Sequence, residues 1–455
     1  MRRLATAAAI LAGVAALAAL MVAREVVPAQ RPPASAEAIA ADQQLGKRFH
    51  INAGELPPPK PTSIRNGPRI LVFEGQTLTV PEGFAATLFA KLENPRRLLV
   101  LPNGDIIAAE QRPGYLTLLR AREGGGRAET IERLAEGFNQ PYGLAWRDDH
   151  LLVADQDGIW KVAHILDTLR TGRGLEGKAA DVASERHNPL HGFARQELIT
   201  KRGVFGVIRG HANRPLAIDR NTGQLFVGVG SMGNVGIEPE VKATIQRFAP
   251  DGTGQVTFVS GVRNTCGLAI HPDTGELWAV VQERDGLGDR LPPDYLVRPE
   301  LGAFYGWPYA YTGQHPQPGY ADRAPEKVAS SKVPDLLFEA HSSALDLIFY
   351  DGAQFPSEYR GDAFVALRGS WNRSQPTGYK VVRVPFKHGR PQGFYENFAT
   401  GFWAAGVARA EVWGRPAAVA VAKDGALLIA DDTGGTIWRV AYVGPRDRAT
   451  GSGER

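Results

Sequence analysis

The feature that most constrains the fold of this chain is a unit that recurs six times along it. Each copy has an opening segment, an apolar pair, a turn that contains glycine, and a short run of residues with high β propensity. Four copies are clear: QPYGLAWRDDHLLVAD, RPLAIDRNTGQLFVGVG, NTCGLAIHPDTGELWAVV and RPAAVAVAKDGALLIADD. The weaker copies are NPRRLLVLPNGDIIAAE, and SALDLIFYDG leading into DAFVAL. This recurrence predicts one supersecondary structure that is used six times.

The six units supply the strands of an all-β protein. The second positions of their opening segments are Pro95, Pro141, Pro215, Thr265, Ala344 and Pro416, and several copies continue into another alternating run, as in GIWKV, GYKVVRV and GTIWRV. Each unit thus offers the hairpins of a four-stranded antiparallel blade, and the sequence predicts a six-bladed β-propeller. The 52 Gly and 32 Pro residues fit a fold with many turns. A two-sheet sandwich with long insertions is the alternative.

The last unit is too short to form a blade by itself. About 40 residues follow Pro416, whereas residues 70–90 contain strand-like segments without a unit of their own. We therefore expect an N-terminal strand to complete the last blade, which closes the ring and removes the exposed sheet edge.

Composition divides the chain into four regions. Residues 1–25 place Arg2 and Arg3 before an apolar stretch and resemble a secretory signal or an uncleaved membrane anchor. Residues 26–68, rich in Pro and Ala, are expected to form a weakly ordered linker. The propeller domain is expected at 69–443 and a polar tail at 444–455. We therefore expect export to the periplasm, with attachment to the inner membrane if the first segment is retained.

Charge and cysteine content exclude several functions. The 52 Lys and Arg residues and the 48 Asp and Glu residues are spread along the chain without basic runs, so no nucleic-acid partner is expected. Cys266 is the single cysteine, which excludes an internal disulfide, a cluster of thiolate ligands and covalent haem. Electrons removed from a substrate would have to leave to a separate acceptor.

Polar residues precede the innermost strand that is expected in each blade. In a propeller these positions converge on one end of the central channel. Cationic side chains gathered there repel one another unless an anionic ligand neutralises them, although an ion pair between blades is the ordinary role of a single arginine. The residues concerned are Gln140, His211, Arg214, Arg263, Asn264, His341, Ser342 and Arg415.

Longer stretches resemble a known enzyme family. The chain from about residue 78 to 443 is similar to the soluble glucose/sorbosone dehydrogenases that depend on pyrroloquinoline quinone (PQQ). The stretches that carry the resemblance are GHANR, SGVRNTCGLAIHP, QERDGLGD with PPDY, FYGWPYAY, HSSALDL, RGDAFVALRGSWNR and WGRPAAVAVAKDG. The resemblance implies PQQ and Ca²⁺ as cofactors, and a sugar or a sugar-derived aldehyde as the substrate.

The resemblance also implies roles for single residues. His211 in GHANR is the expected general base, an imidazole that takes the hydroxyl proton of the substrate. Main-chain carbonyls of Glu283 and Arg284 are expected to bind Ca²⁺, which prefers oxygen ligands. The expected cofactor contacts are Arg214, Arg263, Asn264, Arg368 and Arg415, and the expected substrate contacts are Gln140, His341 and Trp371.

The predicted reaction is the oxidation of a sugar or aldehyde by base-assisted hydride transfer to the quinone, with electrons passed on to an external acceptor. Two other functions remain open. A metal-dependent lactone hydrolase on a similar propeller would need carboxylate and Asn ligands that converge in the channel, and a non-catalytic propeller would only bind carbohydrate or protein. The arginine-rich opening segments favour the dehydrogenase.

Overall fold

The repeated units fold into six antiparallel sheets, each built on four strands, in the computed structural model, which describes residues 33–162 and 196–444. We number the sheets in chain order and give their strands from the inside outward. The first has β4 (Pro95–Val100), β5 (Ile106–Glu110), β6 (Tyr115–Arg120) and β7 (Thr130–Ala135). The second has β8 (Gly143–Arg147), β9 (His150–Ala154), β10 (Ile159–Val162) and β11 (Gln196–Leu198), and the third has β12 (Leu216–Ile218), β13 (Leu225–Val229), β14 (Thr244–Phe248) and β15 (Val256–Ser260).

The remaining three sheets follow the same plan. The fourth has β16 (Asn264–Ile270), β17 (Leu277–Gln282), β18 (Tyr295–Val297) and β21 (Leu336–Leu337). The fifth has β22 (Ala344–Phe349), β23 (Ala363–Leu367), β24 (Lys380–Val384) and β27 (Tyr395–Ala399). The sixth has β30 (Pro416–Val421), β31 (Leu427–Asp431), β32 (Thr436–Tyr442) and, as its outer strand, the N-terminal β3 (Phe84–Lys91).

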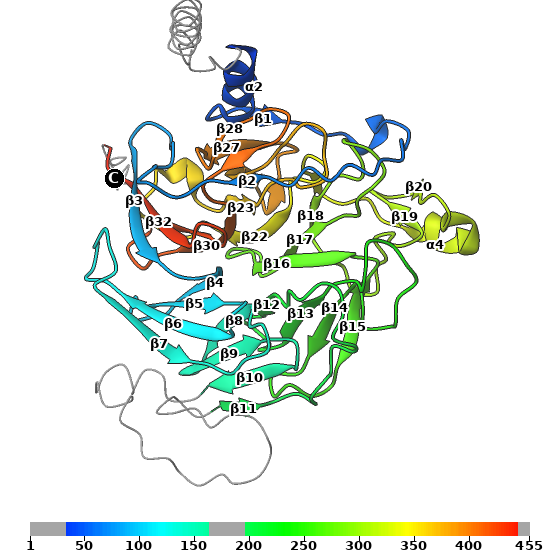
Figure 1. Ribbon diagram of the computed structural model, residues 1–455. Helices are drawn as coiled ribbons and strands as arrows, with labels where there is room; N and C mark the ends of the chain where they lie inside the picture. The colour runs from blue at the N-terminus through cyan, green and yellow to red at the C-terminus, as the bar shows by residue number, and fades with distance from the viewer. Residues whose placement is uncertain (1–32, 163–195, 445–455) are drawn as a thin grey trace, which may run out of the picture.

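The predicted all-β class and the six predicted strand starts are confirmed. Each innermost strand begins within two residues of the position expected from its repeat. The innermost strands contact one another in the order β4, β8, β12, β16, β22 and β30, and β30 also contacts β4 (Figure 1). This arrangement differs from the two facing sheets of a sandwich.

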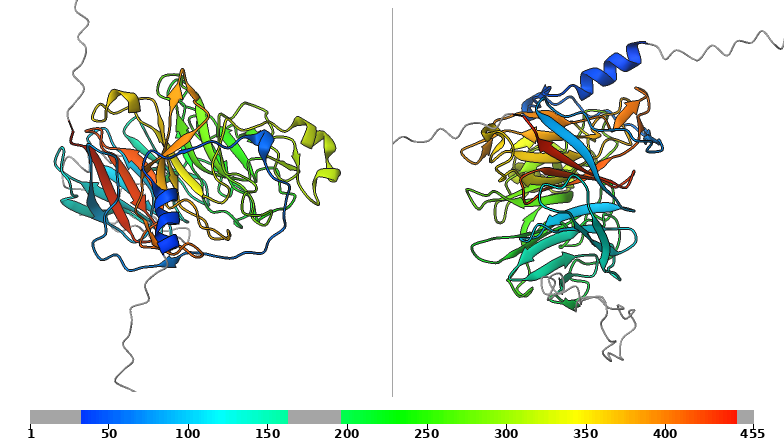
Figure 2. Two further views of the ribbon diagram at one scale, coloured as in Figure 1. Left: turned by 90° about the horizontal axis from the view of Figure 1, so that it is seen from above. Right: turned by 90° about the vertical axis from the view of Figure 1, so that its left-hand side faces the viewer.

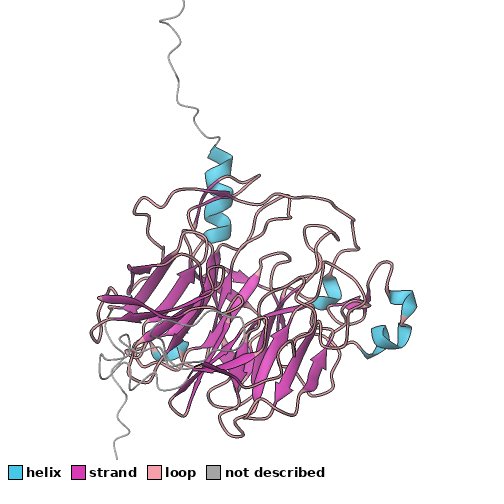
Figure 3. Ribbon diagram, turned by 60° about the horizontal axis from the view of Figure 1, so that its bottom comes forward, coloured by secondary structure: helices cyan, strands magenta, loops and turns pink. Residues whose placement is uncertain are grey.

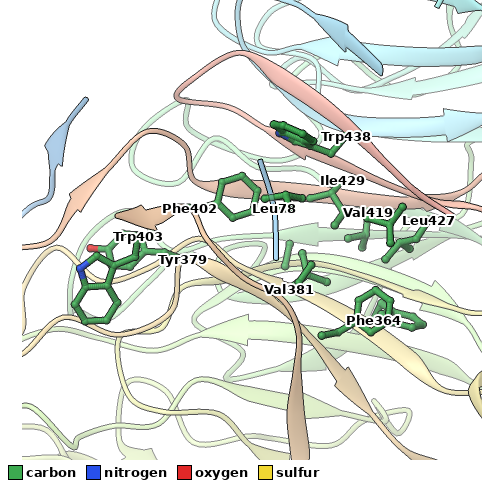
Figure 4. Packing of buried hydrophobic residues seen from close by; sticks show 14 of the residues in the cluster. Leu78, Phe364, Tyr379, Val381, Phe402, Trp403, Val419, Leu427, Ile429 and Trp438 are labelled. Carbon is green, nitrogen blue, oxygen red and sulfur yellow. The ribbon is translucent and has the colours of Figure 1, made fainter. Parts of the chain in front are cut away.

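The second strand of every sheet is buried along nearly its whole length. Because neighbouring sheets cover both of its faces, it is a continuous apolar run and not an alternating one. Between the fifth and sixth sheets, for example, Phe364 and Val381 lie in one cluster with Val419, Ile429 and Trp438 (Figure 4). The apolar runs of the repeats are therefore the interfaces between sheets.

Two glycines of the repeats allow innermost strands to approach closely. A Cβ on Gly143 would lie 2.3 Å from the carbonyl oxygen of Arg214, and a Cβ on Gly267 would lie 2.9 Å from Cα of Asp346. A residue with a side chain cannot take these places without a shift of the neighbouring backbone. The glycine in PYGLA and TCGLA thus has a packing role.

Shorter elements lie outside the main sheets (Figure 3). They include the helices α2 (Pro33–Gln43) and α4 (Pro325–Ser330) and the 3-10 turns η1 (Ala53–Glu55), η2 (Ala321–Arg323) and η3 (Ser357–Tyr359). Short strands form three small sheets. The first consists of β2 (Arg69–Ile70), β29 (Glu411–Val412) and β28 (Trp403–Ala405), the second of β19 (Ala310–Tyr311) and β20 (His315–Pro316), and the third of β25 (Phe386–Lys387) and β26 (Arg390–Pro391).

The region predicted as a linker differs from the expectation. Its described part contacts the sheets: β1 (Arg48–Phe49) pairs with β27, and the Gln43 side chain donates to the Gly378 carbonyl at 3.1 Å. Lys380 Nζ lies 3.1 Å from Asp42 Oδ2. These contacts tie residues 42–49 to the fifth sheet.

The predicted signal or anchor, residues 1–25, lies outside the described residues, as does all of the predicted tail beyond residue 444. Within the part that is described, no helix combines the length and the apolar character needed to span a membrane.

Candidate functional site

The candidate site lies at the starting ends of the innermost strands. Each innermost strand runs antiparallel to the second strand of its sheet, so residues before the first strand and after the second lie side by side. A cavity of about 120 Å³ is found there. It is lined by His211, Arg263, Gln282, Glu283, Asp285, Asp294, His341, Ser343, Trp371 and Asn372.

The imidazole of His211 is held by Ser231, the second residue after β13. Its Nδ1 lies 2.9 Å from the carbonyl oxygen of Ser231 and 3.1 Å from Ser231 Oγ. We assign the proton to Nδ1, where it is donated to the carbonyl, which leaves Nε2 with its lone pair. Burial and the Arg263 guanidinium lower the pKa of His211 to about 3. The ring is therefore a neutral proton acceptor on the cavity wall.

Arg263 lies immediately before β16, and its guanidinium reaches the end of β17. Nη1 donates to the carbonyl of Glu283 at 2.8 Å and to that of Gln282 at 3.4 Å, and Nε donates to the carbonyl of Asn234 at 3.0 Å. Burial lowers the pKa of Arg263. Among the described residues the guanidinium has no ion-pair partner, so its charge can serve an anionic or polar ligand.

His341 precedes β22 with a left-handed backbone, φ 68°. Its Nε2 lies 2.9 Å from the Gly288 carbonyl, and its Nδ1 lies 3.2 Å from Asn372 Nδ2 and 3.6 Å from Asp285 Oδ1. Burial lowers the pKa of His341, but Asp285 and the Gly288 carbonyl raise it more, and the net shift is upward. The two histidines of the cavity thus differ, because the pKa of His211 is lowered and that of His341 is raised.

Two buried carboxyl groups of the cavity, Glu283 and Asp294, form no close ion pair within the described residues. Burial raises the pKa of Glu283 to about 8 and that of Asp294 to about 6. Asp294 accepts from the amides of Glu283 and Ser343 at 2.9 and 2.7 Å, whereas Glu283 Oε1 is buried with no hydrogen-bond partner in the described ranges. A buried carboxyl oxygen without a hydrogen-bond partner, next to a second buried carboxyl, fits a hard cation with oxygen ligands.

The carbonyls predicted to bind calcium lie next to two arginine side chains that donate to main-chain oxygens. The Glu283 carbonyl accepts from Arg263, as described above, and Arg284 Nε donates to the carbonyl of Asp285 at 2.9 Å. Side chains alone do not complete a metal site, because residues 33–162 and 196–444 contain no group of three His, Cys, Asp or Glu arranged to hold an ion. Any cation here would need main-chain oxygens as well.

A second cluster at the same end consists of three arginines and one carboxylate. Asp432, at the end of β31, forms an ion pair with Arg96. Arg368 Nε donates to both carboxylate oxygens of Asp432, each at 3.0 Å. Arg415 donates to the carbonyls of Arg368 and Gly369 at 3.1 and 2.6 Å. Burial, together with the charge of Arg368, lowers the pKa of Arg415 to about 9. Three guanidinium groups facing one carboxylate form a site that fits anionic groups.

Six predicted site residues do not line the cavity: Arg368 and Arg415 lie in the second cluster, and the others are Arg214, Asn264, Gln140 and Arg284. Arg214 is buried, and its guanidinium donates to the carbonyls of His211 and Asn213 at 2.8 Å and to Gln156 Oε1 at 2.7 Å. Asn264 donates to Gln282 Oε1 at 3.1 Å, and Gln140 is exposed outside the cavity. Arg214 therefore supports the segment that carries His211 in place of the predicted cofactor contact.

Several residues of the site are missing from the prediction. Asp432 stands at the end of a second strand, and Arg96 follows the first opening proline. The acidic ends of the quoted repeats, as in IIAAE, LLVAD and LLIADD, were the available signal, because antiparallel pairing returns these ends to the opening segments. Asp294 and Asn372 lie in longer loops without such a signal.

A larger cavity lies at the opposite ends of the innermost strands. Its volume is about 960 Å³, and its walls include Val100, Ile218, Ile270 and Val421. None of the predicted site residues lines it. The concentration of titratable groups selects the smaller cavity as the candidate site.

Comparison with known proteins shows what this chain is similar to. Residues 302–443 match the family described as TrAA12-like. An uncharacterized protein of Borreliella burgdorferi is 28% identical over 377 residues, which cover 80% of this chain and 91% of that protein. The PQQ-dependent pyranose dehydrogenase of Coprinopsis cinerea is 29% identical over 276 residues, which cover 50% of this chain and 36% of that enzyme.

Solved structures extend the match over most of the fold. The PQQ domain of the Coprinopsis cinerea pyranose dehydrogenase, in its holo form, superposes with a TM-score of 0.63 at 18% identity, covering 82% of this chain and 99% of that domain. The calcium structure of the Trichoderma reesei family AA12 enzyme gives a TM-score of 0.63 at 17% identity, covering 82% and 98%. The chain is therefore a structural match to the PQQ-dependent sugar dehydrogenases and a distant homologue of them. The part of the chain that matches the TrAA12-like family is residues 302–443.

Proposed function

We propose that this chain is a PQQ-dependent dehydrogenase that oxidises a sugar or a sugar-derived aldehyde. The observation that carries the proposal is the neutral His211, whose unprotonated Nε2 is the only ring nitrogen left for the cavity once Nδ1 is bound to Ser231. The distant homology to a PQQ-dependent pyranose dehydrogenase supports it.

The two clusters have different roles in this proposal. Arg96, Arg368 and Arg415 would bind carboxylates of the cofactor, since Asp432 balances only part of their charge. PQQ, when bound, supplies the two-electron acceptor for the hydrogen that leaves the substrate carbon. His211 Nε2 would take the proton of the substrate hydroxyl, and the Ser231 carbonyl would stabilise the imidazolium through Nδ1–H. The electrons would pass to an external acceptor.

Calcium belongs to the same proposal. Glu283 Oε1, the carboxyl of Asp294 and the carbonyl oxygens near residue 284 would hold the ion, which compensates the buried carboxyls. A bound divalent ion would favour the ionised form of Glu283, whose pKa is raised by burial and by the neighbouring Asp294.

The finer points of fold and location are also proposals. The antiparallel pairing of β3 with β32 and the contact of β30 with β4 support a six-bladed propeller whose ring is closed by the N-terminal strand. The apolar stretch within residues 1–25 supports export to the periplasm, with or without retention as an anchor. A lactone hydrolase is less well supported, because the arginines gathered around Asp432 fit an anionic cofactor.

Reconstitution tests the proposal directly. The purified protein is mixed with PQQ and Ca²⁺, and dye reduction is measured across aldoses, ketoses and aldehydes. We expect PQQ binding and turnover in the wild type, and loss of turnover with retained PQQ binding in His211→Ala. His388→Asn, in the exposed turn between β25 and β26, is the matched control and should keep full activity. Absence of both binding and reduction in the wild type would refute the dehydrogenase.

A further inference from the structure

The segment between η1 and β2 runs along the rim of the candidate site. We name residues 56–67 the strap. Figures 1 and 2 show this blue segment passing along the outside of the sheets toward β2. Most of its side chains are partly or fully exposed, and several of its backbone groups are bound to loops that belong to distant parts of the chain. The strap therefore interacts with the domain mainly through its backbone.

The first half of the strap is bound to the loop after β17. Lys60 N–H donates to the Leu287 carbonyl at 2.9 Å, and Thr62 N–H donates to the Gly286 carbonyl at 3.1 Å. The approach is close, because a Cβ on Gly288 would lie 3.2 Å from the Lys60 carbonyl oxygen. This loop carries the Gly288 carbonyl that binds His341 Nε2, so the strap holds the partner of a cavity histidine.

The second half of the strap is bound to the loop after β23. Asn66 N–H donates to the Trp371 carbonyl at 2.7 Å, and Asn66 Nδ2 donates to the carbonyls of Arg373, at 3.3 Å, and Ala408. Trp371 lines the cavity, as does Asn372, whose Nδ2 lies 3.2 Å from His341 Nδ1. The two loops that the strap joins are thus the two loops that contact the two nitrogens of His341.

We propose that the strap is a positioning element for the substrate side of the site. By holding loops 286–288 and 371–373 at a fixed separation, it sets the places of His341 and Trp371. None of its described hydrogen bonds reaches Arg96, Arg368, Arg415 or Asp432, so it acts on the substrate side and not on the anion-binding cluster. The substrate part of this inference rests on the proposed function, whereas the binding of the loops does not.

Two pairs of variants isolate the backbone and side-chain bonds of the strap. Lys60→Pro removes the N–H donor in a run already flanked by Pro59 and Pro61, and Lys60→Ala keeps the donor and removes only the exposed side chain. Asn66→Ala removes the side-chain donors, and Ser63→Ala is its exposed control. The loss of one such bond corresponds to about a fivefold change in an equilibrium constant.

The kinetic arm separates a positioning role from a general loss of structure. For Lys60→Pro and Asn66→Ala we expect KM for the sugar to rise about fivefold, while the Kd for PQQ and the unfolding midpoint stay at the wild-type values. Lys60→Ala and Ser63→Ala should match the wild type in all three. Unchanged KM in both test variants overturns the inference, and so does an equal weakening of substrate and PQQ binding.

Hydrogen exchange provides a readout that does not need turnover. Backbone amides of residues 284–289 and 371–373 should exchange faster in Lys60→Pro and Asn66→Ala than in their controls. If the wild-type protein neither binds PQQ nor turns over, the proposed function fails, and exchange alone still decides whether the strap holds the loops. Equal exchange rates of these amides in the test and control variants would show that the strap does not hold the two loops.

Discussion

Asp432→Asn tests whether one carboxylate holds the arginine cluster together. The side chain of Asp432 is 2% exposed, is bonded by Arg96, and receives Arg368 Nε at 3.0 Å on both oxygens. Asparagine keeps the size of the side chain but removes its charge and turns an amide N–H group toward a guanidinium. Arg96 and Arg368 would then face each other without a counter-charge, with Arg415 close by.

The expected cost follows from burial. Removing one partner of a buried ion pair costs about 3–5 kcal/mol, a factor of about 10²–10⁴ in the folding equilibrium. Burial raises the pKa of Asp432, but Arg368 and Arg96 lower it more, so that it lies well below its ordinary value. Because the folded pKa is depressed, the stabilisation is present above the unfolded pKa and is lost as the pH falls toward the folded pKa. The difference between variant and wild type should therefore shrink below about pH 4.

Urea unfolding followed by tryptophan fluorescence measures this difference at pH 7 and at lower pH. Glu129→Gln is the matched control, because Glu129 pairs with Arg122 on the surface, where the side chains are 58% and 82% exposed and a pair contributes less than about 1 kcal/mol. Excess citrate, a polycarboxylate, should restore more stability to Asp432→Asn than to the wild type. An Asp432→Asn protein as stable as the control variant, or a deficit that does not depend on pH, would refute the reasoning.

Three further results are expected. Gly267→Ala should lower the free energy of unfolding by about 1–3 kcal/mol in the same urea assay, because the new Cβ meets Asp346 at 2.9 Å; an unchanged midpoint would contradict the close approach of the strands. The pKa of His211 is lowered to about 3, so its neutral form persists as the pH falls through 6.5, and an NMR titration should show no protonation of this imidazole near pH 6.5; protonation there would contradict the lowered pKa. Burial raises the pKa of the Cys266 thiol to about 12, so a thiol reagent should label it only after unfolding, and labelling of the native protein would argue against its burial.

The fold was predictable because its signals are local. Each repeat places its turn glycine and its buried run within about 20 residues. A strand that is covered on both faces has a continuous apolar sequence, whereas a strand with one face in solvent alternates. The glycine of PYGLA and TCGLA was part of the repeat, but its reason is a contact with the next sheet, which sequence spacing alone does not show.

The site was predictable only in part, because hydrogen-bond partners depend on neighbours in space. His211, Arg263, His341 and Trp371 meet at one cavity as their positions suggested. The spacing H-x-x-R gave no sign that the Arg214 guanidinium turns inward to backbone carbonyls.

The N-terminal region shows the same limit. An extended Pro-rich segment has no internal hydrogen bonds, so its composition is the same whether its backbone faces water or other loops. The strap is part of the predicted linker, and its composition alone does not tell a bound segment from a free one.

The pairing of β3 with β32 sets an order of events in the cell. Thr87 and Arg439 are 352 positions apart in the chain and are register partners in the sixth sheet. A growing chain can form its first five sheets as they emerge, but β3 must wait with an open edge until nearly the whole protein has been made. Translation that stops before residue 436 would release a chain with an unpaired strand, which favours aggregation and removal by proteases.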